Sequence, residues 1–220
     1  AQVFLACTLA IGAWAHEVGV EPMKDVCAVF TPSRDLEQRQ ANSEMVDCLE
    51  LFAGQARVSE AFAKKRRGVL QPRDIRFGHD FRKSQVRDEI LHEIKTKRPG
   101  MVWMAPPCTY WCGFSRLNFS PQERRRLRAK ERVLIQFVDG VIETQNLLGG
   151  MAIVENPRSS DMWRHSALQR WILKPDIHLA KVDLCAYGMV SSDHAVPMRK
   201  PLSLLCNNGR FAEHITKLCD

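Results

Sequence analysis

Residues 101–108 read MVWMAPPC and residues 151–157 read MAIVENP, and both segments begin as apolar runs of strand length. Each run stops at a polar reactive group, which is Cys108 in the first segment and Glu155 in the second. Ligands of open parallel sheets bind in the crevice beyond the carboxyl ends of the strands. If both runs are strands of one such sheet, this thiol and this carboxyl face one pocket. That combination is typical of a covalent nucleophile with an acid partner.

Strand and helix patterns alternate around these two runs. The alternation predicts an α/β fold with a mostly parallel sheet, helices on both faces and an antiparallel edge. The edge is expected at 179–185, because apolar and charged residues alternate there. The expected strands cover 45–51, 101–105, 151–154, 179–185 and 202–206, with short additional strands at 69–75 and just before Asp80, and the expected helices cover 57–66, 83–97, 121–148 and 161–173.

The helix expected at 121–148 has the clearest end signals. Ser120 is a typical N-cap, Pro121 suits the first helical position, and Glu123 completes a capping box. An apolar stripe follows, and Gly149 with Gly150 ends the helix.

Composition is that of a globular protein with an excess of positive charge. Of 220 residues, 45% are hydrophobic and 26% are charged, and the net charge is +7. This balance favours a polyanionic partner such as nucleic acid. The eight cysteines form no CxxC pair and fit no zinc template, so we expect reduced thiols, no metal, and a location in the nucleus or cytoplasm.

Three regions are expected along the chain. Residues 1–43 are interpreted as an N-terminal extension and linker, because 31–43 is polar and rich in turn formers. Residues 44–210 form the catalytic domain, and 211–220 form a C-terminal tail. The apolar run at 3–15 lacks a preceding basic residue and is too short to span a bilayer. We therefore expect no membrane anchor there, and a chain derived from a longer precursor.

Three motifs together resemble the DNA cytosine-5 methyltransferases. Residues 50–54, ELFAG, are similar to the first motif of that family. Pro107-Cys108 is similar to its proline–cysteine motif, and Glu155-Asn156 to its glutamate–asparagine motif. All three stand in the family's order at ends of predicted strands, and the similarity spans about 45–207. The resemblance implies a Rossmann-like, S-adenosylmethionine-dependent methyltransferase fold and methyl transfer to C5 of cytosine in nucleic acid. The family favours DNA as the substrate, whereas the residues themselves do not distinguish DNA from RNA.

The resemblance also implies roles for individual residues. Cys108 is the expected nucleophile and Glu155 the expected acid, with Arg199 as a third catalytic residue. The implied contacts to S-adenosylmethionine are Glu50, Phe52, Ala53, Gly54, Asp74, Asp80 and Pro106. The two aspartates also fit the alternative of an N-cap or turn residue. For Cys108 the alternative is an inert buried thiol, and for Glu155 a solvated loop carboxylate.

Residues 124–132 form the strongest basic cluster of the chain. They follow the Cys108 loop closely, so phosphates of a bound strand are expected to contact Arg124, Arg125 and Arg128. A solvated helix face would carry the same pattern.

The sequence departs from the family at several positions. Ala56 stands where the family has a second loop glycine, Thr109 where it has glutamine, and Pro157 where it has valine. The motif that contains Arg199 is fragmentary. Because only about 13 residues follow Asn207, we expect a separate domain or chain to supply target recognition.

Two other functions remain open on these residues. A catalytically degenerate methyltransferase fold, kept as a binding or interaction module, is favoured by Ala56 and by the missing recognition region. An amino-group methyltransferase is the third hypothesis. Ala105 and Cys108 count against it, because such enzymes carry Asp or Asn before Pro-Pro and an aromatic residue after it.

Overall fold

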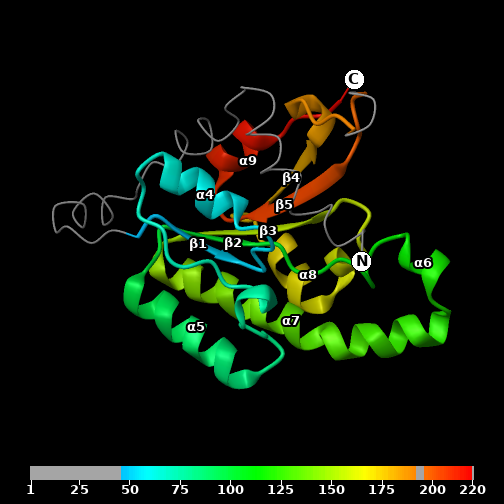
Figure 1. The fold of residues 1–220 in the computed structure, drawn as a ribbon, viewed down its shortest axis with the longest axis horizontal. Coiled ribbons are helices and arrows are strands. Elements are labelled where there is room, and N and C mark those ends of the chain that lie inside the picture. Colours follow the sequence, from blue (N-terminus) through cyan, green and yellow to red (C-terminus); the bar gives the residue numbers. More distant parts are fainter. Residues whose placement is uncertain (1–45, 192–195, 220) are drawn as a thin grey trace.

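The computed structural model describes residues 46–191 and 196–219, and a mixed five-stranded sheet runs through its centre (Figure 1). The strand order is β1-β2-β3-β5-β4. The strands are β1 (Cys48–Leu51), β2 (Met101–Met104), β3 (Met151–Pro157), β4 (His178–Asp183) and β5 (Pro201–Cys206). β1, β2 and β3 are parallel, whereas β5 pairs antiparallel with both β3 and β4.

The parallel half of the sheet brings three loops to one edge. Leu51 of β1 pairs with Met104 of β2, and Met104 pairs in turn with Val154 of β3. The segments that follow these three residues therefore leave the sheet side by side. They carry the three sequence motifs.

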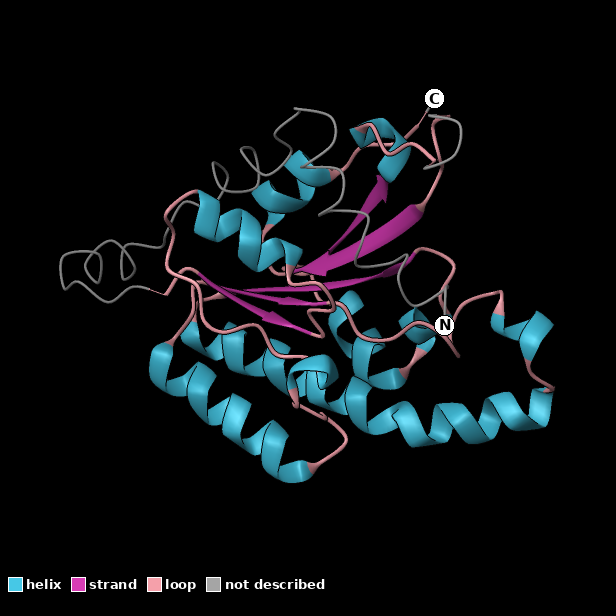
Figure 2. Cartoon of the chain, in the orientation of Figure 1, coloured by secondary structure: helices cyan, strands magenta, loops and turns pink. Residues whose placement is uncertain are grey.

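Helices cover both faces of the sheet (Figure 2). On one face lie α4 and α9, and on the other lie α5, α7 and α8 (Figure 1). The helices are α4 (Arg57–Lys64), α5 (Ser84–Lys97), α6 (Ser115–Asn118), α7 (Pro121–Leu148), α8 (Ser166–Ile172) and α9 (Gly209–Ile215), with 3-10 turns η1 (Ile75–Phe77), η2 (Asp161–Arg164) and η3 (Leu184–Tyr187).

The core consists of two apolar clusters separated by the sheet. The cluster under α5, α7 and α8 includes Val154 and Ile142, which are fully buried. The opposite cluster, under α4 and α9, includes Trp103 and Phe211. Side chains of a strand alternate between faces, so neighbouring residues of β3 contribute to different clusters.

None of the helices described is both long and apolar enough to cross a membrane.

Most of the expected elements are present, and the α7 signals are confirmed in detail. The Ser120 hydroxyl accepts from the Glu123 amide and the Glu123 carboxylate accepts from the Ser120 amide, each over 3.2 Å. Gly149 ends the helix with a φ of 71°, a conformation that glycine adopts without a steric penalty. The antiparallel edge is also confirmed, because β4 pairs only with β5 among the strands described.

Some expectations differ from the structure. The segment 69–75 does not form a full strand: only Val69 and Arg73 make isolated bridges to β1, because Asp74 turns the chain into η1. The helix expected at 161–173 is split, because the His165 backbone is extended and its side chain caps α8. The expected tail begins inside α9, whose apolar residues pack on the sheet. The extension and linker at 1–43 lie outside the described residues.

Candidate active site

A pocket of about 200 Å³ opens where β1 and β2 end. Six of the residues expected at the site line it: Phe52, Gly54, Asp74, Asp80, Pro106 and Cys108. Its walls come from the loops after β1 and β2, from the segment 74–82, and from one turn of α7. The structure thus gathers segments that are up to eighty residues apart in sequence around one cavity.

The loop between β1 and α4 has an unusual backbone. Phe52, Gly54 and Ala56 all have φ angles near 55°, in the left-handed region. The Asp74 carboxylate holds this loop, because it accepts from the Gly54 amide over 3.0 Å. Backbone strain of this kind persists where the surrounding structure imposes it, and it is concentrated at functional sites.

Glu50 does not line the pocket. Its carboxylate accepts from the Ser59 amide over 2.7 Å, in the first turn of α4. That helix has no side-chain cap of its own at Ala56, so Glu50 satisfies an amide that the helix leaves open. Burial raises the pKa of Glu50 to about 6, although its hydrogen bonds to α4 oppose the shift. Ala53, also expected at the cofactor, is fully buried and is not part of the pocket wall.

Cys108 is half-buried, and a tight turn follows it. The Cys108 carbonyl accepts from the amides of Trp111 and Cys112, each over 2.9 Å. Just before it, the Pro106 carbonyl accepts from the Asn156 side chain over 2.9 Å. Asn156 is buried, so the ends of β2 and β3 are joined through its carboxamide. Asn156 was not among the predicted catalytic or binding residues, although it belongs to the glutamate–asparagine motif.

Glu155 is buried at the end of β3, where the Trp103 indole donates to its carboxylate over 3.3 Å. It points toward the face of the sheet that bears Trp103 and is not among the residues lining the Cys108 pocket. This differs from the expectation that both groups face one pocket. The alternation of side chains along β3 explains the difference, because Asn156 occupies the other face.

Asp80 and Glu131 add two carboxyls to the pocket wall. Asp80 pairs with Arg82 over 2.8 Å, and this guanidinium lowers the pKa of Asp80. Glu131 of α7 accepts from the Trp111 indole over 3.0 Å. Glu131 was not predicted from the sequence, because it lies within the basic run and only the folded chain brings it to the pocket that Cys108 lines.

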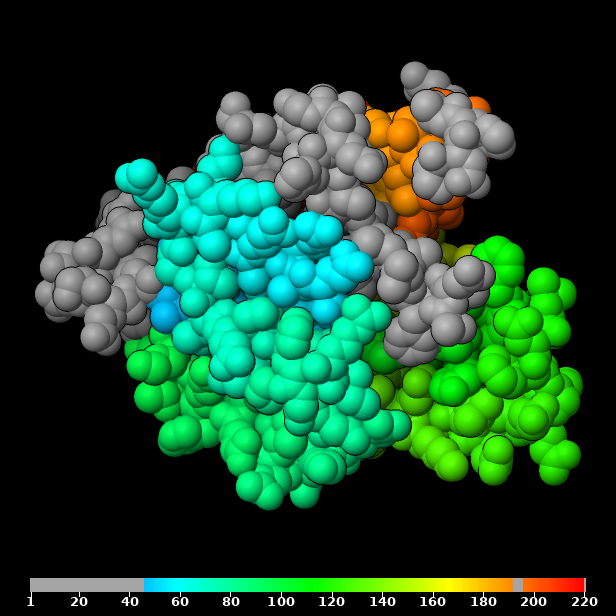
Figure 3. All heavy atoms as spheres, viewed as in Figure 1, coloured from blue at the N-terminus to red at the C-terminus, as the bar shows by residue number. Residues whose placement is uncertain are grey.

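The basic cluster is divided between two environments. Arg125 is exposed and Arg124 is half-buried, and both lie on the part of α7 that extends beyond the sheet with α6 (Figure 1). The green atoms of this part form the right-hand margin of the molecule (Figure 3). Arg128, in contrast, forms an ion pair with Asp161 over 2.6 Å. Its guanidinium is already engaged within the protein.

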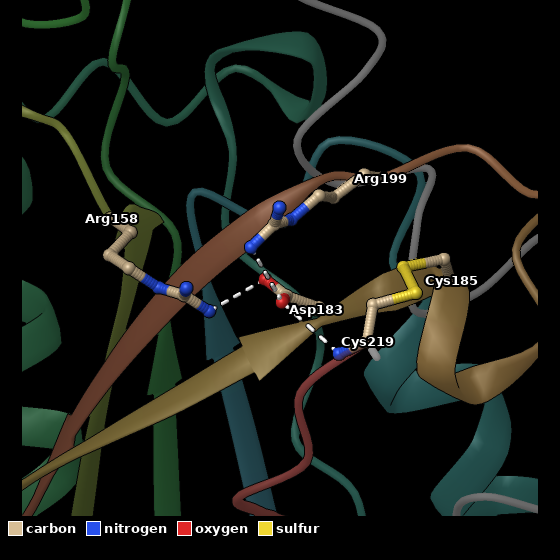
Figure 4. The surroundings of a disulfide bond; sticks show 5 residues. All are labelled: Arg158, Asp183, Cys185, Arg199 and Cys219. Atoms are coloured by element: carbon tan, nitrogen blue, oxygen red, sulfur yellow. Dashed lines mark hydrogen bonds and ion pairs between the residues drawn. A yellow bond between two sulfur atoms is a disulfide. The ribbon is translucent and has the colours of Figure 1, made fainter.

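Arg199 lies at a second charged cluster (Figure 4). The fully buried Asp183 carboxylate accepts from Arg158 over 2.7 Å and pairs with Arg199 over 3.5 Å. Arg199 itself is largely exposed and is not part of the Cys108 pocket wall.

Beside this charged cluster, Cys185 and Cys219 form a disulfide. The expectation that every thiol is reduced is therefore wrong for this pair, because α9 returns the chain to η3 and brings the two cysteines together.

No family model matches the chain, and no curated protein matches it. Within 46–191 and 196–219, no group of three His, Cys, Asp or Glu side chains is arranged to hold a metal ion.

The left-handed conformation of Ala56 generates a stability prediction. Replacing Ala56 by Gly removes the contact between its Cβ and the backbone, so the free energy of unfolding should rise by about 1 kcal/mol. As a control, Ala129→Gly on the exposed face of α7 should lower it by about 1 kcal/mol. Urea unfolding of the two variants measures both values. A destabilised Ala56→Gly variant would contradict the strained conformation.

The raised pKa of Glu50 generates a prediction about pH. Between about pH 4.5 and 6 the folded chain binds more protons at Glu50 than the unfolded chain does, so the free energy of unfolding falls as pH rises. A pKa raised from 4.5 to about 6 corresponds to a loss of about 2 kcal/mol, complete above pH 6. Glu50→Gln should lack this loss.

Urea unfolding at several pH values measures the difference between wild type and Glu50→Gln. The exposed α9 residue Glu213 is the matched control, and Glu213→Gln should follow the wild-type curve. Parallel curves for wild type and Glu50→Gln would show that Glu50 titrates as it does in the unfolded chain.

Proposed function

We propose that this chain is a cytosine-5 methyltransferase that transfers a methyl group from S-adenosylmethionine to C5 of cytosine in nucleic acid, DNA rather than RNA. The observation that carries the proposal is the junction of the two reactive motifs. Asn156 donates to the Pro106 carbonyl, so the segment before Cys108 and the segment after Glu155 are in direct contact. The order of the strands also supports it, because β1, β2 and β3 end at one edge of the sheet.

The residues around the pocket fit S-adenosylmethionine. Apolar side chains of Phe52, Ile75 and Phe81 line it and offer a surface for a flat purine ring. Asp74 lies beside them at the start of η1, where a carboxylate suits ribose hydroxyls. The Arg82 guanidinium lowers the pKa of Asp80, so Asp80 is ionised at neutral pH and can accept from an exocyclic amine. The bound cofactor supplies an electrophilic methyl group.

The task of Cys108 in this proposal is to make C5 of the ring nucleophilic. Its thiolate adds to C6, so an S–C6 bond forms and the electron pair of the C5–C6 double bond becomes available at C5. After C5 has accepted the methyl group, the proton on C5 leaves to water. The S–C6 bond then breaks, the double bond is restored, and the thiolate is regenerated.

Glu155 is the proposed acid for the addition step. A protonated carboxyl there donates to N3 of the cytosine as the thiolate attacks C6, and takes this proton back on elimination. The base has to lie across the strand ends, between Cys108 on one side and Glu155 on the other. The contact from Asn156 to Pro106 keeps these two sides at a constant separation.

The basic residues in the first turns of α7 are the proposed contact to phosphates. Arg124 and Arg125 lie on the extended half of α7, away from the sheet. Phe114, 66% exposed, precedes α6 in the same region and can stack on an unpaired base. Arg128 serves instead to hold the Cys108 turn, through its hydrogen bond to the Tyr110 carbonyl over 2.6 Å.

Covalent trapping tests the proposed chemistry. An oligonucleotide with 5-fluorocytosine should form a stable adduct with the protein, because fluorine at C5 cannot leave as a proton and the S–C6 bond persists. The adduct should require S-adenosylmethionine and should be lost in Cys108→Ser, whose hydroxyl is a far weaker nucleophile at neutral pH. Denaturing electrophoresis and mass spectrometry of the modified peptide measure it.

Two further variants sharpen the test. Cys112→Ser removes the neighbouring buried thiol and should leave trapping intact. Glu155→Gln should slow trapping, because an amide does not supply the proton that N3 requires. Methyl transfer that persists at full rate in Cys108→Ser would contradict the proposal and favour an exocyclic amine as the acceptor. A chain that binds the cofactor but neither traps nor methylates would support the degenerate binding module.

A further inference from the structure

The turn that carries Cys108 is held by α7 through Trp111. The Trp111 indole donates to the Glu131 carboxylate over 3.0 Å. At the other end of this residue, the Trp111 carbonyl accepts from the Asp161 amide over 2.8 Å. Trp111 is buried, and its own amide donates to the Cys108 carbonyl. Glu131 therefore reaches the backbone of Cys108 through a single intervening residue.

Arg128 strengthens the same attachment from one turn earlier in α7. Its guanidinium lies 5.0 Å from the centre of the Trp111 ring, at a separation typical of a cation–π contact. It also donates to the Tyr110 carbonyl and pairs with Asp161, each over 2.6 Å. Two side chains of α7, three positions apart, thus hold the Cys108 turn. Glu131 contacts the Trp111 side chain, and Arg128 contacts both the Trp111 ring and the Tyr110 backbone.

The Glu131 carboxyl also faces the pocket that Cys108 lines. Burial raises the pKa of Glu131 to about 7, and the Trp111 hydrogen bond and the Arg82 charge oppose this shift. The other charged or titratable side chains that line this pocket besides Cys108 are Asp74, Arg76, His79, Asp80 and Arg82, and Arg128 of the same helix lies over the Trp111 ring. Its charge therefore changes near neutral pH, within the cavity that contains the thiol.

We infer that Glu131 is a positioning residue for Cys108, which it orients through Trp111, and that its negative charge opposes formation of the Cys108 thiolate. A like charge in a shared pocket disfavours ionisation of the second group. The inference rests on the proposed function in one respect, since it treats Cys108 as the reacting group. Its two parts are separable, because one depends on a hydrogen bond and the other on charge.

Alkylation of Cys108 by iodoacetamide tests the charge, because the thiolate displaces iodide and forms a thioether without any substrate or cofactor. The rate is followed by mass spectrometry of the Cys108 peptide over a range of pH. Glu131→Gln keeps an acceptor for the Trp111 indole and removes the charge. Its Cys108 should react about three- to tenfold faster at pH values above 7 but below the pKa of the thiol, which corresponds to a thiol pKa lower by about 0.5 to 1.

Trp111→Phe tests the positioning, because it keeps an aromatic ring and removes the indole N–H. Hydrogen exchange at the amides of residues 111 and 112 should accelerate in this variant and stay unchanged in Glu131→Gln. The control for charge is Glu143, which lies on α7 like Glu131 and whose carboxylate pairs with Arg170 of α8; the variant is Glu143→Gln. It should leave the alkylation profile of Cys108 unchanged.

The outcomes separate the inference from the proposed function. An alkylation profile of Glu131→Gln that coincides with wild type would overturn the role of the charge. Unchanged hydrogen exchange in Trp111→Phe would overturn the positioning. If both effects appear but 5-fluorocytosine traps no protein, the inference stands and the proposed methyl transfer fails.

Discussion

The hydrogen bond from Asn156 to the Pro106 carbonyl is the contact on which the arrangement of the site depends. It is buried and joins the ends of two parallel strands whose ladder pairing stops at Met104 and Val154. Beyond this level the sheet no longer determines how far the two loops are apart. A carboxamide that spans the gap therefore holds the segment before Cys108 against the end of β3, and an unpaired buried amide would cost about 1–3 kcal/mol.

Buried carboxyls recur around this junction, and each accepts a hydrogen bond from a neighbouring element. Glu50 accepts from the first turn of α4, Glu131 from Trp111, and Glu155 from Trp103. Burial of a carboxylate opposes folding unless hydrogen bonds compensate for the lost solvation. Two of these groups have raised pKa values as a result. Buried carboxyls with raised pKa values and a left-handed backbone in the loop after β1 both oppose folding locally. Such features are typical of functional sites, whereas a region that only packs the core lacks them.

The fold was largely predictable because its signals are local. Strand-length apolar runs, the capping box at Ser120 and the glycine at 149 are all read within a few residues of sequence. The site was less predictable from the sequence. Glu50 and Phe52 belong to the same motif, yet one caps a helix and the other lines the pocket, because the chain turns sharply at the end of β1. Glu131 and Asn156 acquire their roles from residues 20 and 50 positions away, and such contacts follow only from tertiary packing. The Cys185–Cys219 pair depends likewise on α9, a helix that sequence analysis treated as a tail.

The most direct test of this account is calorimetric titration of the full chain with S-adenosylmethionine. The account predicts saturable one-to-one binding that weakens in Asp80→Ala, since the pocket wall then loses the carboxylate proposed to accept from the exocyclic amine. The exposed Asp88 of α5 provides the control, and Asp88→Ala should bind as wild type does. Absence of saturable binding by the wild-type chain at millimolar ligand would contradict the account, because every methyl-transfer reading of this pocket requires that cofactor.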